Sequence, residues 1–446
     1  MPHSQVDEPL EVTLLREFSQ QGTTSFHETR VREIIKTWVQ EGPSGTGESV
    51  ELSELKGNLV FTYTGRPSND LPAVAFAAHM DHPGFLVLEP SRYAEFGVET
   101  PQSGDPRKEY VLAKVMGGMS KDIVGARLDF YDKGKGYFTD CGTIREVVLG
   151  KNERPDLVWI EKRLTTRLST DRNGVIANFN FSPFPKSPNP FEIVDGVIKA
   201  PILDDLAGCA AIMAAFSKIV EAHLEVNVYA VFHWGEELGF LGAHQVAMSG
   251  ILPKDTFVYS VDTSSHVKPG KDPGSVVSTG IELGKGAVIR SGDRISPNYS
   301  WQALQLLRSA GENLDGLRQM HGRSEATQDA YANAGSCEAT AYLIHGYRAA
   351  AIALPLRYWH NNVVGEPTEA DPRGACREEI AVSDLQDARS LMYQTAVAIP
   401  GSNRLRELEP AWRRETYNLS PLQQELKTEG PRDVLRLSAQ FGVRES

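Results

Sequence analysis

Imidazole and carboxylate side chains recur where the apolar runs of this sequence end. The residues that could act together in this way are His79, Asp81, Asp204, Asp205, Glu236, Glu237, Asp262 and His360. Two imidazoles with several carboxylates form a donor set that suits zinc, cobalt or manganese. Carboxylates gathered in one place also repel one another unless cations lie between them. The residue types therefore indicate a divalent metal site.

Each of these short patterns has a simpler structural explanation when it is taken alone. The adjacent glutamates could lie at a solvated helix start, where the helix dipole favours acids. The aspartate pair could cap the helix that follows it. A histidine beside an aspartate could be a surface pair, and one after an aromatic run could be a buried structural histidine. Taken together, the simpler explanation requires several independent coincidences at the same place, so we favour the metal site.

The elements that must position these residues alternate between strands and helices. The expected strands are 71–81, 226–234, 257–262 and 349–360, and the expected helices are a pair within 8–41, then 206–223, 239–248, 299–310, 336–346 and 383–399. Such alternation predicts an α/β fold with a mostly parallel central sheet flanked by helices. Ligands of such sheets bind beyond the carboxyl ends of the strands, which is where the candidate residues stand.

The sequence pattern between the first strand and the aspartate pair differs from the strand–helix alternation of the rest. Short β-like pieces there are separated by Gly, Pro and Asp, which predicts a small β domain inserted into the larger one. The expected division is residues 1–89 and 198–400 for the catalytic domain and 90–197 for the insert. Residues 401–446 are polar and are expected to form an appended helical tail.

Composition excludes several classes of protein. The 446 residues include 46 Lys and Arg against 58 Asp and Glu, a net charge of −12, which argues against a nucleic-acid partner. No apolar run approaches the roughly 20 residues that a membrane helix needs. The first residues resemble no secretory signal, and four widely spaced cysteines predict no disulfide framework, so we expect a cytoplasmic protein. Cys337 has no activating base nearby in sequence and is not expected to be a nucleophile.

Several segments carry a family resemblance. AAHMDHPGFLV, ILDDLAG, EELGFLGA, SVDTS and ALPLRYWHNN, in this order, with IELGKGAVIRSGD at 281–293, resemble the glutamyl/tetrahedral aminopeptidase family of dinuclear metallo-aminopeptidases. That family belongs to a wider clan of co-catalytic zinc exopeptidases. The resemblance covers roughly residues 8–400. It implies a zinc-exopeptidase-like fold with a small inserted β-barrel-like domain, and it implies a homo-oligomer.

The resemblance also implies roles for individual residues around two divalent ions per subunit, with zinc first and cobalt or manganese as alternatives. The implied ligands are His79 and Asp262 on one ion, Glu237 and His360 on the other, and Asp204 bridging both. Glu236 would be the general base, and Asp81 would orient His79 through the second ring nitrogen. Asp204 is favoured over Asp205 because the bridging residue of the family stands four positions before the glycine of the helix.

Some positions depart from the family pattern. His82 and Pro83 replace a usual Glu-Ile, Leu206 replaces an Arg, and Asn361 replaces a Ser; Ser336-Cys337-Glu338 replaces Gly-Thr-Asp. None of these changes removes an implied ligand or the base. For His82, a contact to substrate or to a ligand and a position on the surface both remain open.

The expected function is therefore an aminopeptidase that hydrolyses short peptides through a water activated by Glu236. One alternative is a metal-dependent amidohydrolase that deacylates N-acyl amino acids at the same site. Another is a non-catalytic interaction protein of the same fold, although such a protein would have no need of a general base.

Overall fold

The computed structural model describes residues 8–41, 49–65, 73–99, 109–132, 138–150, 153–162, 174–182, 190–269, 276–320, 327–330, 335–363 and 374–399. The tail expected at 401–446 lies outside the described residues. Within the described part of the chain, no helix is both long and apolar enough to cross a membrane. All four cysteines are buried, and none of them forms a disulfide.

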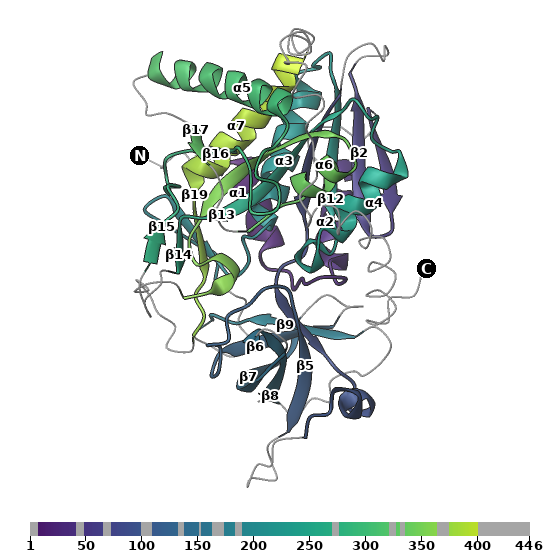
Figure 1. Cartoon of the computed structure of the whole chain (residues 1–446), viewed down its shortest axis with the longest axis vertical. Coiled ribbons are helices and arrows are strands. Elements are labelled where there is room, and N and C mark those ends of the chain that lie inside the picture. The colour runs from purple at the N-terminus through teal and green to yellow at the C-terminus, as the bar shows by residue number, and fades with distance from the viewer. Residues whose placement is uncertain are drawn as a thin grey trace, which may run out of the picture.

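An eight-stranded sheet forms the centre of the larger domain (Figure 1). Its strands, in spatial order, are β1 (Val50–Leu55), β2 (Asn58–Thr64), β12 (Asn227–His233), β3 (Val74–His79), β13 (Phe257–Ser265), β18 (Arg348–Leu356), β16 (Ala287–Arg290) and β17 (Thr327–Ala330). The four middle strands β12, β3, β13 and β18 are parallel to one another. The pairings β1–β2, β2–β12 and β18–β16 are antiparallel, so the sheet is mixed and its parallel part is the centre. The expected α/β class is confirmed in this form.

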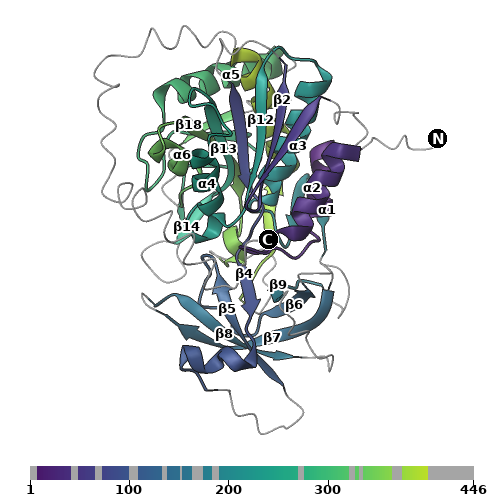
Figure 2. The same ribbon diagram turned by 90° about the vertical axis from the view of Figure 1, so that its right-hand side faces the viewer.

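Helices cover both faces of this sheet. They are α1 (Leu10–Phe18), α2 (Thr29–Glu41), α3 (Leu206–Glu221), α4 (Leu241–Ser249), α5 (Trp301–Met320), α6 (Ala339–Ile344) and α7 (Val382–Ala398). α1 and α3 lie on one side of the strands, and α4 and α6 lie on the other (Figure 2). α3 is buried along nearly its whole length, because its many alanines and one glycine let it pack closely between the sheet, α1 and α7.

A second domain is a closed six-stranded antiparallel barrel, below the sheet in Figure 1. Its strands are β4 (Gly84–Val87), β5 (Tyr110–Met116), β6 (Arg127–Asp132), β7 (Phe138–Leu149), β8 (Pro155–Lys162) and β9 (Val175–Phe179), with the short helix η2 (Pro90–Phe96) after β4. Side chains such as Phe85, Leu128, Phe130 and Val158 fill its interior.

The barrel does not keep the expected limits of 90–197. It begins at Gly84, since β4 pairs with both β5 and β9 and closes the barrel. Beyond its last strand, β10 (Glu192–Val194) and β11 (Val197–Ala200) form a small sheet with β19 (Glu378–Ala381) of the larger domain. β14 (Val267–Pro269) and β15 (Val276–Ser278) form a separate hairpin. We therefore propose that the inserted domain spans 84–179.

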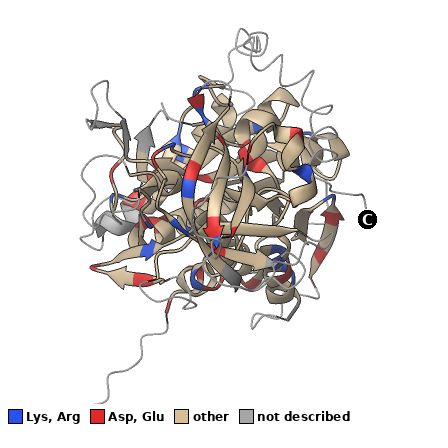
Figure 3. Ribbon diagram, turned by 90° about the horizontal axis from the view of Figure 1, so that it is seen from below, with Lys and Arg blue, Asp and Glu red and all other residues tan. Residues whose placement is uncertain are grey.

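The charges on the barrel side are interspersed. Seen from below, Lys and Arg positions are scattered among Asp and Glu positions along the described part of the ribbon (Figure 3).

Candidate metal centre

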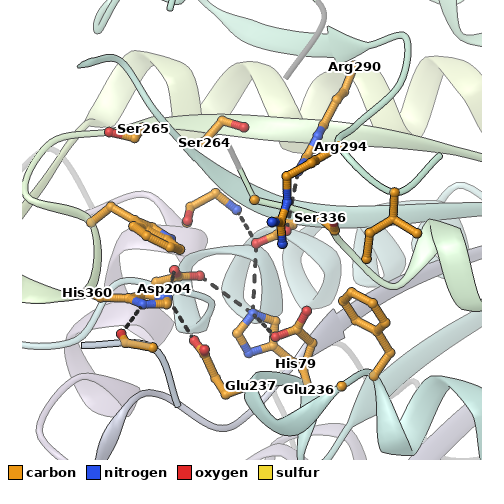
Figure 4. A pocket seen from close by; sticks show the side chains of 18 of the residues that line it. His79, Asp204, Glu236, Glu237, Ser264, Ser265, Arg290, Arg294, Ser336 and His360 are labelled. Atoms are coloured by element: carbon orange, nitrogen blue, oxygen red, sulfur yellow. Dashed lines mark hydrogen bonds and ion pairs between the residues drawn. The ribbon is translucent and has the colours of Figure 1, made fainter. Parts of the chain in front are cut away.

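The parallel strands at the centre of the sheet deliver the candidate residues to one edge (Figure 4). His79 is the last residue of β3, and Asp262 lies toward the end of β13. The glutamate pair opens the turn η4 (Glu236–Leu238) after β12, and His360 lies in the turn η5 (Trp359–Asn361) after β18. Asp204 comes just before α3, and its carboxylate faces the same pocket. Parallel pairing thus converts distant positions in sequence into one cluster.

One group of possible ligands surrounds His79. Its Nε2 lies 3.5 Å from Asp204 Oδ1 and 3.8 Å from Asp262 Oδ1. Ligand atoms from these three buried residues all lie within 4.8 Å of one another, which is close enough for a single ion.

A second group surrounds His360. Its Nε2 lies 2.9 Å from Glu237 Oε1 and 3.3 Å from Asp204 Oδ2. Asp204 therefore directs one carboxylate oxygen toward each histidine and belongs to both groups. A third possible combination joins His79 with Glu236 and Glu237.

Asp204 and Asp205 face different partners, although they are adjacent. Asp205 is the N-cap of α3, and its Oδ1 accepts a hydrogen bond from Gly208 N at 3.0 Å. Asp204 is buried, and its Oδ1 makes no hydrogen bond within the described structure. A buried carboxylate oxygen without a donor, between two imidazoles, fits a bound cation.

Both imidazoles are held by backbone carbonyls at Nδ1. His79 Nδ1 donates to Asp81 O at 2.9 Å, and His360 Nδ1 donates to Gly118 O at 2.6 Å. Gly118 follows barrel strand β5, so the inserted domain takes part in the site. With the proton on Nδ1, each Nε2 directs its lone pair into the pocket, as a metal ligand requires.

The Asp81 side chain has a different principal contact from the one expected. Its Oδ1 lies 3.6 Å from His79 Nδ1, farther than the hydrogen-bonded carbonyl. Its carboxylate instead accepts hydrogen bonds from the backbone N–H of Glu236 at 2.9 Å and Glu237 at 3.2 Å, and from Ser25 Oγ at 2.6 Å. Asp81 therefore fixes the turn that carries both glutamates.

The electrostatics of the site reflect a crowd of buried acids. Burial raises the pKa of Glu236 well above its ordinary value, and burial also raises the pKa of Asp262. Burial works against protonation of His79 and His360, but the carboxylates around them raise the pKa of both imidazoles well above the ordinary value. Glu236 and Asp262 thus hold protons more tightly than free carboxyl groups do, and the neighbouring acids favour the charged form of both imidazoles.

Two further residues singled out from the sequence are buried. His82 is 1% exposed, so a surface position is excluded. Its Nδ1 donates to the backbone carbonyl of Asp204 at 2.6 Å, and burial lowers its pKa to about 4. Cys337 is fully buried, and burial raises the pKa of its thiol to about 12, so it stays protonated near neutral pH.

Sequence reasoning missed several residues of the site. Glu28 and Glu378 are buried carboxylates that hold backbone N–H groups near the ligands, and Arg154, Arg290 and Arg294 line the pocket. None of them stands beside a ligand in sequence, and only Arg290 lies in a quoted motif, the segment 281–293. For Glu378, the one sequence signal is the segment REEIAV, in which charged residues come directly before the apolar part of a strand.

The comparisons with known proteins agree with this geometry. The model of the M42 glutamyl aminopeptidase family matches residues 165–365, which include every candidate ligand except His79. No curated protein sequence matches the chain significantly.

Solved structures of aminopeptidases share the fold. Aminopeptidase APDkam598 from the archaeon Desulfurococcus kamchatkensis is 18% identical, with a TM-score of 0.63 over 90% of this chain and 98% of that one. The TET aminopeptidase from a marine sediment Thaumarchaeota archaeon is 18% identical, with a TM-score of 0.61 over 88% and 98%. The TET1 peptidase of Pyrococcus horikoshii, described as assembling into a tetrahedron or a large octahedral shell, is 21% identical, with a TM-score of 0.58 over 86% and 99%.

The match to the family model, together with the shared fold and the cluster at the sheet edge, identifies the chain as an aminopeptidase, a hydrolase of peptide bonds. Over residues 165–365 the chain is similar to the M42 glutamyl aminopeptidase family. The family resemblance inferred from the motifs is therefore confirmed.

Glu28 offers a test of the electrostatics. Its Oε1 accepts hydrogen bonds from Phe26 N and Gly235 N, and burial beside Asp81 raises its pKa to about 8. An acid with a raised pKa in the folded state contributes stability below its unfolded pKa of 4.5 and loses that contribution as the pH rises through about 8. Glutamine preserves both hydrogen bonds without the charge.

We predict that Glu28→Gln flattens the pH dependence of stability. Between pH 4.5 and 8, its free energy of unfolding should gain on the wild type by up to about 1.4 kcal/mol per pH unit. Denaturant unfolding at several pH values, with a chelator present, measures this difference. Glu17→Gln, at an exposed position of α1, is the control. Parallel profiles for Glu28→Gln and the wild type would contradict the prediction.

Proposed function

We propose that this chain is a dinuclear, metal-dependent aminopeptidase that removes N-terminal residues from short peptides. The observation that carries the proposal is the position of Asp204, whose two oxygens face two separate ligand groups. His79 and Asp262 would hold one ion with Asp204, and Glu237 and His360 would hold the other. Zinc is the first candidate, with cobalt or manganese as alternatives.

The chemistry divides between the ions and the chain. Bound divalent ions at such a site lower the pKa of the attacking water and polarise the scissile carbonyl. Glu236 is the general base: it accepts the water proton at its carboxylate and returns it to the departing amine. Its Oε2 lies 3.9 Å from His79 Nε2, inside the pocket, while Asp81 holds its backbone. Asp81 is a positioning residue that keeps the base and Glu237 in their different directions.

The pocket also has a cationic side. Arg154 and Arg294 are exposed at its rim, and the buried Arg290 lies with NH1 3.4 Å from Asp262 Oδ2. Two divalent ions would balance the four pocket acids, and the guanidinium groups of Arg154 and Arg294 would then add positive charge at the rim. This balance favours peptides with an anionic group near the N-terminus, since guanidinium binds carboxylate well.

The other proposed properties rest on weaker support. A homo-oligomer is proposed because similar structures are described as a dodecamer and as a tetrahedral or octahedral shell. A cytoplasmic location is proposed because the four cysteines are free, as in a reducing compartment. A zinc-exopeptidase-like arrangement of the site is part of the same proposal.

The alternative functions separate on substrate. A deacylase would hydrolyse N-acyl amino acids, whereas an aminopeptidase requires a free amino group. The match to an aminopeptidase family model speaks against a non-catalytic interaction protein. A library of matched N-terminally free and N-blocked peptides distinguishes the two enzymes directly.

We predict that chelation abolishes hydrolysis of amino-acid anilides and that zinc or cobalt restores it, because the buried acids need the cations to act on water. Release of the aniline from free and N-acylated substrates is the measurement. Full activity of a metal-free preparation would overturn the mechanism, and a preference for the acylated substrates would favour the deacylase.

Glu236→Gln should retain metal and fold but lose kcat by about 100- to 10,000-fold, because the amide cannot accept the water proton. Its backbone N–H can still donate to Asp81. Steady-state kinetics with metal analysis measures both effects, and Glu221→Gln at the exposed end of α3 is the control. Normal turnover in the Glu236 variant would remove this residue from its role.

Arg294→Ala should lower kcat/KM for glutamyl anilides by about tenfold relative to leucyl anilides, because it removes one cation from the pocket. Lys121→Ala removes an exposed positive charge that does not line the pocket and should leave the ratio unchanged. An unaltered ratio in the Arg294 variant would show that this guanidinium does not read substrate charge.

A further inference from the structure

Glu378 joins two of the ligands without touching the pocket. It lies in β19 and is fully buried. Its Oε2 accepts hydrogen bonds from Leu203 N at 2.6 Å and Asp204 N at 3.0 Å, and its Oε1 accepts one from His360 N at 2.8 Å. One carboxylate therefore connects the segment before α3 with the turn after β18.

The segments that Glu378 joins lie outside the strands of the central sheet. Asp204 precedes a helix, and His360 lies in a turn where its own φ is 54° and that of Asn361 is 59°. Left-handed backbone of this kind costs free energy at non-glycine residues and persists only when surrounding contacts impose it. The hydrogen bond to Glu378 is one such contact.

The ligands of the other group are supported differently. His79 ends β3 and Asp262 lies in β13, and these two strands are paired directly in the sheet. Their separation is set by strand pairing, which Glu378 does not contact. Loss of Glu378 should therefore disturb the Glu237–His360 position more than the His79–Asp262 position.

We propose that Glu378 is a positioning residue that fixes the separation of Asp204 and His360 and so sets the affinity of the metal position formed by Glu237 and His360. The inference rests on the proposed dinuclear function. The position formed by Glu237 and His360 should depend on this buried carboxylate more than the position formed by His79 and Asp262.

The test is the metal content of Glu378→Gln. In glutamine, one oxygen becomes an NH2 group, which faces an N–H donor and cannot accept its hydrogen bond. Metal-free protein is titrated with zinc against a chromophoric chelator, and bound metal per subunit is counted after gel filtration. Wild type should bind two ions; the variant should keep one tightly and bind the second roughly 10- to 100-fold more weakly.

The neighbouring Glu379→Gln is the matched control. Glu379 is 3% exposed in the same strand, but it forms ion pairs with Arg357 at 2.7 Å and Lys199 at 3.4 Å. The Glu379→Gln variant should bind two ions with wild-type affinity, even if its thermal unfolding temperature changes. Unfolding of all three proteins in chelator checks that each is folded before metal is added.

The outcomes are distinguishable. Two ions at wild-type affinity in Glu378→Gln would overturn the inference, and so would equal loss in the Glu379 control. Fewer than two ions in the wild type would overturn the dinuclear proposal itself, and this inference with it. If Glu378→Gln does not fold, Glu378→Asp keeps the charge but shortens the reach by one methylene. Selective weakening of one ion in that variant supports the inference, and unchanged binding overturns it.

Discussion

The mutual repulsion of buried carboxylates at the sheet edge is the constraint on which the rest of this structure depends. Asp204, Glu236, Glu237 and Asp262 approach two imidazoles in one pocket. Acids brought together in such a place are unfavourable unless cations, protons or hydrogen-bond donors compensate them. The fold must therefore hold these side chains against a force that would separate them, and cations must supply the remaining compensation.

Carboxylates outside the ligand set hold the backbone of the ligands in place. Glu28 and Asp81 together hold the N–H groups of Gly235, Glu236 and Glu237, and Glu378 holds those of Asp204 and His360. Hydrogen bonds that several N–H groups donate to one carboxylate are directional. These carboxylates form a second layer of buried acids around the inner layer of ligands. Burial raises the pKa of both Glu28 and Glu378 to about 8. The backbone of the ligands is thus held by hydrogen bonds to these buried carboxyl groups.

The sequence predicted which His, Asp and Glu side chains gather at the sheet edge, and it predicted much of the fold, because both depend on local patterns. Short apolar runs that end in His, Asp or Glu mark parallel strands and the residues at their carboxyl ends, and parallel pairing then brings His79 and Asp262 together without further information. The outer layer could not be predicted in this way, since Glu28 and Glu378 reach the site only through tertiary packing. The limits of the barrel escaped for a related reason. β4 has four residues and begins at the glycine of a His-Pro-Gly segment, which is typical of a turn. Only its pairing with β5 and β9 defines it as a strand.

The carbonyl of Gly118 ties the orientation of the His360 ring to the barrel. The inserted domain is therefore a structural component of the centre, although all the side chains that would bind cations come from the larger domain. A displacement of the barrel relative to the sheet would rotate or release this imidazole, whereas the His79 ring is held by the carbonyl of Asp81, outside the barrel strands. The two halves of the centre would then respond unequally to movement between the domains, and insertions or deletions in the barrel would be tolerated only where they leave the end of β5 in place.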